Sequence, residues 1–196
     1  SGLFQRPDRY TGKDFVQGNI GETFIRFSLV DAEEKYEEEV RGADGKTRTE
    51  TRYRTIFRGL FFAGDFNKNF NGKTLVRPSA VNFLSNLFGN HVALEDPEFN
   101  QWFTVTSTDQ VEARYIMTPS LMEKFKALKT RLGPFRASFF SKNVYLAVDM
   151  RYDSFEPSLT KSFTAEDQLE KIMGNLMSIT RIVEDLGLNV RIWTKS

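Results

Sequence analysis

The sequence contains no cysteine and a single histidine, His91. The first absence excludes disulfide bonds, thiol catalysis and cysteine-ligated metal sites, and it fits a reducing compartment. The second excludes a histidine-rich metal site, and a lone histidine is more often incidental than catalytic. We therefore expect no metal site and no cofactor in this chain.

Long apolar runs and a strong net charge are missing as well. No run approaches the roughly 20 apolar residues of a membrane-spanning helix, so membrane contact is expected only through segments outside this chain. With a net charge of +1, the chain has no bulk positive field, and we expect no nucleic-acid partner. The sequence starts without methionine, which indicates a piece of a longer protein. We expect a cytoplasmic region held at the membrane by a missing N-terminal segment.

Phenylalanine is the residue that the sequence has in quantity, with 19 among 196 residues. Apolar residues make up 40% and charged residues 27% of the chain, a balance typical of globular proteins. The length allows one sizeable domain or two small ones. Because no linker or internal repeat interrupts the sequence, residues 1–196 are predicted to form a single domain.

The stretch from Thr23 to Gly64 has the pattern of two long strands folded back on each other. Apolar residues alternate at its start, an acidic arm follows, and a turn at 42–45 leads into a return arm rich in threonine and arginine. A disordered charged loop over residues 31–55 is the alternative. The strict alternation of threonine with charged residues favours the strands. The apolar base belongs to the core, and the charged tip is expected to project beyond it.

Charge pairing predicts the register of this hairpin. Opposite charges face each other when Glu37 lies opposite Arg48 and Asp31 lies opposite Arg54. The other face would then be mildly apolar. Its candidate binding residues are Tyr36, Thr49, Thr51 and Tyr53. We expect the hairpin 31–54 to dock a protein partner or another copy of the chain through this face.

Capping signals predict helices in the second half of the chain. Single helical turns or helices should begin at Asp96-Pro97 and Thr118-Pro119, where proline follows a capping residue. Asp109 with Glu112 three residues later has the pattern of a capping box. Apolar periodicity predicts one further helix at 79–89 and the longest at 164–187.

The remaining segments complete the predicted fold. Residues 1–22 are expected to be irregular, residues 65–72 to form a loop, and strands 135–140 and 144–149 to form a second hairpin. Strand pairs followed by helices predict an α+β fold. We expect a mainly antiparallel sheet with a long projecting β-hairpin and a long C-terminal helix.

Two groups could carry catalysis, and each has a plainer structural interpretation. Ser158 and Lys161 match a Ser-x-x-Lys pair, but the companion elements of that enzyme class are missing. Glu95, Asp96 and Glu98 could hold a metal or act as acid and base. Carboxylates on such a turn more often stabilise a helix N-terminus. We assign no catalytic residue.

Two motif-like stretches also fail as ligand sites. Asp65, Asn67, Asn69 and Asn71 alternate as in a calcium loop, yet the glycine and glutamate that such a loop requires are absent. A turn with asparagine side chains bonded to their own backbone is the preferred interpretation. Gly72-Lys73-Thr74 lacks the preceding glycine of a phosphate-binding loop.

Several segments, in the same order, resemble one bacterial family. They include Ser1-Gly2-Leu3-Phe4, Phe57-x-Gly59-Leu60-Phe61-Phe62-Ala63-x-Asp65, Leu94-Glu95-Asp96-Pro97-Glu98-Phe99 and Asp109-Gln110-Val111-Glu112-Ala113-Arg114-Tyr115, with 155–159 and 191–195 further on. The chain is similar over nearly its whole length to family 3137 in the domain-of-unknown-function series. The resemblance implies a soluble C-terminal region that follows membrane helices in longer members. It implies no activity, cofactor or catalytic residue.

Two functions of different classes remain open. The leading expectation is a non-catalytic binding or scaffold module of a membrane-associated bacterial protein. The alternative is a hydrolase-type enzyme that uses carboxylates or the Ser158–Lys161 pair in a cleft. A deep polar pocket with perturbed titratable groups would favour the enzyme, and a shallow surface with one projecting arm would favour the module.

Overall fold

The computed structural model describes residues 1–41, 47–79, 90–149 and 184 of the chain. In these residues the chain forms a six-stranded antiparallel sheet, in the order β1-β2-β3-β5-β4, with β6 paired to β3 as well. The strands are β1 (Arg9–Ile20), β2 (Thr23–Arg41), β3 (Thr47–Pro78), β4 (Asn90–His91), β5 (Phe103–Ser107) and β6 (Phe135–Asp149). The helices are α1 (Pro97–Trp102), α2 (Gln110–Ile116) and α3 (Pro119–Leu132).

The expected α+β class is wrong, because strands dominate the described part of the chain. The longest helix there, α3, has 14 residues, whereas β3 alone has 32. The fold is mostly antiparallel sheet with three short helices. Of the helices predicted at 79–89 and 164–187, the described residues include only Ser79 and Glu184, and the expected long C-terminal helix has no counterpart among the described residues.

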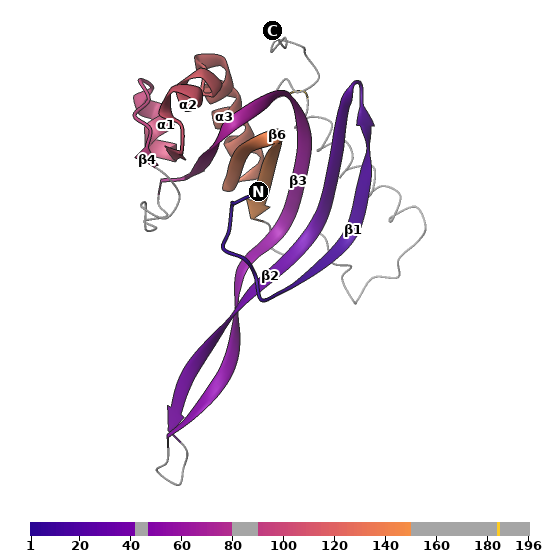
Figure 1. Ribbon diagram of the computed structural model, residues 1–196, viewed down its shortest axis with the longest axis vertical. Coiled ribbons are helices and arrows are strands. Elements are labelled where there is room, and N and C mark those ends of the chain that lie inside the picture. Colours follow the sequence, from indigo (N-terminus) through magenta and orange to yellow (C-terminus); the bar gives the residue numbers. More distant parts are fainter. Residues whose placement is uncertain (42–46, 80–89, 150–183, 185–196) are drawn as a thin grey trace.

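Strand β3 is the central strand of the sheet and pairs with three other strands along its length. Its first part pairs with β2, up to Gly64 opposite Ile25. From Gly59 to Val76 it pairs with β6, and its last residues pair with β5. Figure 1 shows β3 curving from the tip of the hairpin to the helices.

The predicted loop at 65–72 is wrong, because these residues belong to β3. The pairing with β6 shifts register between Asp65 and Phe70 and again before Lys73. Phe66 and Phe70 are buried, and their rings lie 5.6 and 5.7 Å from the ring of Phe139. Burial of two phenylalanines thus draws an asparagine-rich segment into the sheet.

Two further predictions failed for related reasons. The expected hairpin around residues 141–143 is one continuous strand, β6, in which Ser141 adopts a positive φ of 58°. The expected irregular segment at 1–22 contains β1, which pairs with β2 through a bulge between Lys13 and Val16. The two aromatic residues of β1, Tyr10 and Phe15, are 72% and 63% exposed.

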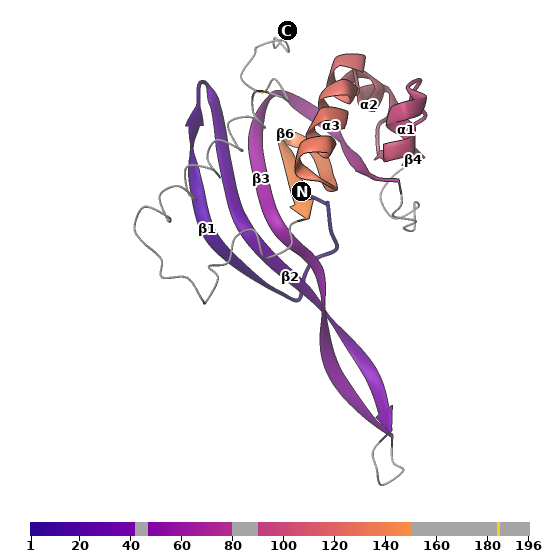
Figure 2. The ribbon, with the colours of Figure 1, turned by 180° about the vertical axis from the view of Figure 1, so that it is seen from behind.

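The sheet buries apolar residues on both faces. On one face the helices cover β3, β5 and β6 (Figure 2). This main core contains a group of buried rings: Phe99, Phe103, Phe125, Phe135 and Phe139. On the other face a smaller core forms around Leu3, Phe57 and Leu75. There the N-terminal segment lies on the sheet, with the Phe4 ring packed at a tilt against the Phe57 ring, 4.7 Å between ring centroids.

The predicted helix starts are confirmed. The side chain of Asp96 accepts a hydrogen bond from the Phe99 N–H at the start of α1, and Thr118 accepts one from Leu121 at the start of α3. Asp109 accepts from the N–H groups of Val111 and Glu112 at the start of α2. Each contact spans two or three residues, which is why the sequence alone predicts it.

The reciprocal half of the predicted capping box is wrong. The carboxylate of Glu112 accepts hydrogen bonds from the N–H groups of Asn71 and Gly72 in β3, at 3.0 and 2.8 Å. The N–H of Asp109 instead donates to the Ser107 hydroxyl at 3.0 Å. Glu112 therefore ties α2 to the irregular part of β3.

Candidate functional site

Strands β2 and β3 continue beyond the rest of the sheet as a two-stranded arm, defined here as residues 33–41 and 47–55. Figures 1 and 2 show this arm projecting away from the sheet and the helices. None of the described residues in the arm is buried. Its strands are therefore held together by backbone pairing and by exposed side-chain contacts, without a core of their own.

A β-bulge separates the arm from the sheet. Ala32 lies opposite Phe57, whereas the next residue, Glu33, lies opposite Thr55. Ile56 is thus the extra residue of the bulge. Bulges bend a strand and increase its twist, so this position sets the direction in which the arm leaves the sheet.

The predicted register of the hairpin is wrong. Glu37 lies opposite Thr51 instead of Arg48, and Asp31 lies opposite Arg58 instead of Arg54. The core decides the register: Phe27 pairs with Phe62 and Leu29 with Leu60, and most of these side chains are buried. Each buried side chain contributes about 1.5–3 kcal/mol, whereas an exposed charge pair contributes about 0.2–1 kcal/mol.

The shift by three positions in the arm exchanges the faces on which the return-strand residues lie, because side chains alternate along a strand. One face, here the paired-charge face, carries Glu34, Tyr36, Glu38 and Val40 with Arg48, Glu50, Arg52 and Arg54. The other, here the threonine face, carries Glu33, Lys35, Glu37 and Glu39 with Thr49, Thr51, Tyr53 and Thr55.

The candidate binding residues are therefore divided between the two faces. Thr49, Thr51 and Tyr53 lie together on the threonine face, and Tyr36 lies on the paired-charge face opposite Arg52. All three return-strand residues are exposed, and Tyr36 is half-buried. A single docking surface can include three of the four predicted residues.

Charges on the paired-charge face neutralise one another. Arg54 forms an ion pair with Glu34, and its guanidinium lies 5.8 Å from the ring centroid of Tyr36. Arg52 contacts Glu38 at 2.9 Å and Glu50 at 3.5 Å. The arginines are thus neutralised by carboxylates of the hairpin, as the sequence indicated, although their partners differ from the predicted ones.

The threonine face has a different electrostatic character. Glu37 lies opposite Thr51 and Glu39 lies opposite Thr49. In the part of the chain that the structure describes, neither carboxylate forms an ion pair. This face therefore presents hydroxyl groups and unpaired carboxylates to solvent.

The start of β1 fastens the base of the arm. The Asp8 carboxylate accepts a hydrogen bond from the Lys35 N–H at 2.6 Å, and the Asp8 N–H donates to the Glu33 carbonyl at 3.0 Å. Arg9 forms an ion pair with Glu33, and its guanidinium lies 4.1 Å from the Tyr53 ring centroid. The hydrogen bond with Glu33 raises the pKa of Arg9. Both residues contact the arm just beyond the bulge.

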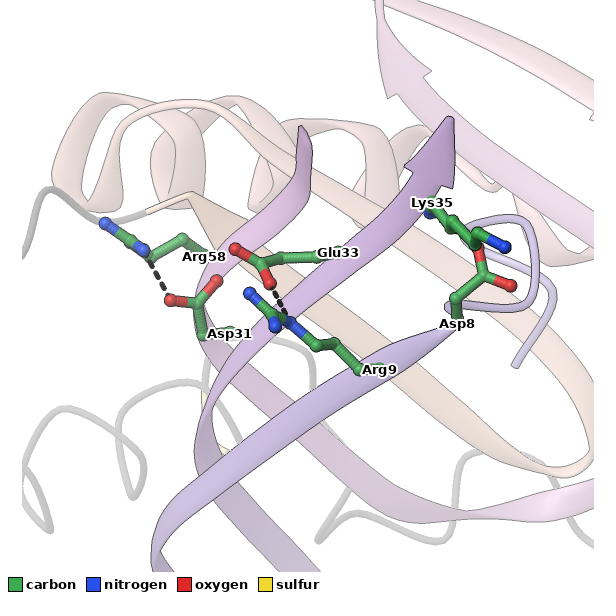
Figure 3. Close-up of polar contacts among 6 residues, drawn as sticks. All are labelled: Asp8, Arg9, Asp31, Glu33, Lys35 and Arg58. Carbon is green, nitrogen blue, oxygen red and sulfur yellow. Dashed lines mark hydrogen bonds and ion pairs between the residues drawn. The ribbon is translucent and has the colours of Figure 1, made fainter. Parts of the chain in front are cut away.

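Figure 3 shows Asp8 beside Lys35 and Arg9 beside Glu33, together with a second ion pair, that of Arg58 with Asp31. Arg58 donates to the Asp31 carboxylate from Nε at 2.9 Å and from Nη2 as well. Asp31 and Arg58 lie just before the bulge, and Glu33 and Arg9 lie just after it. No local pattern in the sequence marks Asp8 and Arg9, because their contacts depend on the pairing of β1 with β2.

The acidic group near α1 has a structural role. Lys126, whose side chain is 9% exposed, lies 2.7 Å from Glu98, 2.7 Å from Glu123 and 3.3 Å from Asp96. Hydrogen bonds with Glu123 and Glu98 raise the pKa of Lys126. The Phe99 N–H and then Lys126 lower the pKa of Asp96. Asp96 and Glu98 are thus engaged with a helix start and one lysine, and Glu95 is exposed.

The remaining candidate residues from the sequence are one histidine and the Ser158–Lys161 pair. His91 is exposed on β4, opposite Thr106. Ser158 and Lys161 lie outside the described residues. Across residues 1–41, 47–79 and 90–149, no group of three or more histidine, aspartate or glutamate side chains is arranged to hold a metal. Nor does this part of the chain contain a helix long and apolar enough to cross a membrane.

Comparison with protein families decides the relationship that the sequence motifs indicated. Residues 55–188 match the family described as protein of unknown function, DUF3137. The chain belongs to this family. The match to DUF3137 begins at Thr55, in the return strand of the arm.

Comparison with solved structures finds a distant likeness for the DUF3137 chain. The crystal structure of the mycobacterial trehalose monomycolate transport factor A, TtfA, is 10% identical, with a TM-score of 0.39. The alignment covers 90% of this chain and 88% of that one. A likeness with this TM-score does not assign a fold or a function to the DUF3137 chain. Among curated proteins, no match was found.

Proposed function

We propose that this DUF3137 chain is a non-catalytic binding module that docks a protein partner through the threonine face of its arm. The observation that carries the proposal is the arm itself, nine residue pairs long and without a buried residue. A two-stranded ribbon of this kind adds little to the stability of a domain. Its length serves contact with something outside the described fold.

The threonine face is better suited to docking than the paired-charge face. On the paired-charge face, a partner would have to compete with ion pairs that already satisfy Arg52 and Arg54. On the threonine face, the hydroxyls of Thr49 and Thr51 are exposed beside unpaired carboxylates. These groups can bond a partner without breaking contacts within the arm.

The anchoring at the base supports the same role. Asp8 and Arg9 hold Glu33 and Lys35, the first residues of the arm, and thereby fix its direction. A rigid arm loses less conformational entropy on binding than a mobile one. We place the module in a bacterial, membrane-associated protein, as the family resemblance implies, and we treat self-association as the competing outcome.

Site-specific photo-crosslinking tests this proposal. A photoreactive amino acid at Thr51 reacts with molecules bound to the threonine face. The same group at the adjacent Arg52 reacts with molecules bound to the paired-charge face, at the same distance from the tip of the arm. In the native host, we expect Thr51 to yield one discrete crosslinked protein and Arg52 to yield little or none. Equal products from both positions, or no product from Thr51, would contradict the proposal.

A shortened arm supplies the control. Residues 36–52 are removed and Lys35 is joined to Tyr53 by Asn-Gly, which closes a tight hairpin in the observed register. The crosslink from a photoreactive group at Thr55 should then disappear, while thermal stability changes little because no buried residue is lost. A crosslinked product of twice the chain mass would assign the arm to self-association instead.

A further inference from the structure

An apolar pocket of about 380 Å³ lies at the base of the arm, beneath the N-terminal segment. Phe4 and Tyr10 form its N-terminal side, and Val30, Ile56 and Phe61 form its floor on β2 and β3. Its volume falls in the range of about 300–1,000 Å³ that is usual for small-molecule sites. None of the functions considered above uses this pocket.

The bulge and the N-terminal segment create the pocket together. Ile56 is the extra residue of the bulge, and it is followed by Phe57, against whose ring Phe4 packs. Tyr10 lies opposite Ala32 in the pairing of β1 with β2, and Ala32 lies opposite Phe57, so Tyr10 and Phe57 face the same side of the sheet. Four apolar residues of the pocket lining are only partly buried: Phe4, Val30, Ile56 and Phe61. Covering such surface gains about 25 cal/mol per Å².

The charge at the pocket narrows the choice of ligand. Arg6 has the one charged side chain among the described residues that line the pocket, and Arg6 is exposed. Within the described residues, Arg6 forms no ion pair. A guanidinium matches the planar, two-oxygen geometry of a carboxylate. The other polar lining side chains, those of Ser1 and Gln5, carry no charge, while Ser1 also bears the terminal ammonium group, whose pKa is lowered by burial.

We propose that this pocket binds a small amphiphile made of one carboxylate and an unbranched aliphatic chain. The aliphatic chain of the ligand lies on Val30, Ile56 and Phe61, and its carboxylate lies at Arg6. A strongly polar ligand such as a sugar is disfavoured, because its hydroxyls would lose water without gaining partners on an apolar floor. The site is independent of partner docking by the arm.

Titration with octanoate, hexanoate and 1-octanol tests the assignment on the whole chain with labelled methyl groups. Octanoate should shift the methyl signals of Val30 and Ile56 and leave that of Leu128, in the main core, unchanged. Hexanoate should bind up to about 15-fold more weakly, since it lacks two methylenes of about 0.8 kcal/mol each. 1-Octanol should bind about two- to fivefold more weakly, because it lacks the exposed ion pair.

Two variants separate the head-group contact from a general apolar effect. Arg6→Gln should reduce octanoate affinity about two- to fivefold and leave 1-octanol unaffected, while Arg26→Gln, on another exposed arginine, should change neither. Val30→Phe fills the floor and should weaken all three ligands. Because Arg6 is exposed, its substitution leaves folding intact. Absence of methyl shifts, or equal binding of octanoate and 1-octanol in wild type and Arg6→Gln, would overturn the proposal.

Discussion

Gly72 lies where β3 passes close to the start of α2. A Cβ atom at this position would lie 2.9 Å from Cβ of Asp109 and 3.0 Å from the Thr108 hydroxyl. The neighbouring N–H groups at Asn71 and Gly72 are held by Glu112. Close approach of two backbones therefore requires glycine here, within a strand where glycine is normally unfavourable.

We expect Gly72→Ala to destabilise the protein by about 1–3 kcal/mol, the usual cost of overpacking a well-packed site. Urea unfolding followed by circular dichroism measures the change. Gly18→Ala is the matched control, because a Cβ atom at Gly18 in β1 meets no atom within 4 Å. Similar losses in both variants would show that the contact with α2 does not matter.

Asp96 is the second residue whose role can be isolated, through its pKa. The Phe99 N–H and Lys126 stabilise the charged carboxylate and lower the pKa of Asp96 below its ordinary value of 3.8. The charged form is thus favoured in the folded state. Its contribution to stability is present above pH 3.8 and is lost as the pH falls through the lowered value.

Asp96→Asn should therefore flatten the acid side of the stability profile. Asparagine caps helices as well as aspartate does, so the variant removes the titration and keeps the helix start. Unfolding midpoints in urea are measured at several pH values on both sides of the ordinary carboxyl pKa, for wild type and variant. Asp65→Asn, at an exposed aspartate of β3, controls for the loss of one negative charge. An unchanged acid limb would refute the role assigned to Asp96.

At the scale of elements, the arm and its bulge form one mechanical unit with the start of β1. The bulge bends β3 at Ile56, and Asp8 bonds the backbone of β2 immediately beyond it. The arm has no buried residue of its own, so these contacts at the base reinforce the link that the continuous strands β2 and β3 make to the rest of the sheet.

Asp8→Ala should loosen the arm without unfolding the sheet. The Lys35 N–H loses its acceptor, which contributes about 0.5–1.5 kcal/mol, so its amide exchange should accelerate about two- to tenfold. Hydrogen exchange read by NMR reports this directly. The amide of Leu60, in the buried part of β3, is the internal reference. Acceleration at both amides would indicate global destabilisation and contradict an anchoring role.

At the scale of the whole molecule, long-range packing overrode several local patterns. Phe66 and Phe70 pack against Phe139, about seventy residues later in the chain, and this contact converts an asparagine-rich stretch into part of β3. A glycine-rich first segment becomes β1 because β2 offers it an edge to pair with. Such pairings depend on partners that no local window contains.

In the candidate site too, local patterns were predicted correctly and long-range pairings were not. The sequence predicted that residues 31–54 form strands of opposite charge, and it named Thr49, Thr51 and Tyr53, which share a face. It placed Tyr36 with them, and it missed Asp8 and Arg9. Both errors follow from register and from β1, which depend on the apolar pairs at the base and on residues distant in the chain.

The sequence by itself determined the family and the helix starts at Asp96, Asp109 and Thr118. Motifs and caps are local, and a cap bonds a neighbour two or three residues away. Only the tertiary structure decided the mostly antiparallel fold, the path of β3 and the faces of the arm. These depend on which apolar side chains are buried together, since burial of one such residue contributes about 1.5–3 kcal/mol and an exposed charge pair only about 0.2–1 kcal/mol.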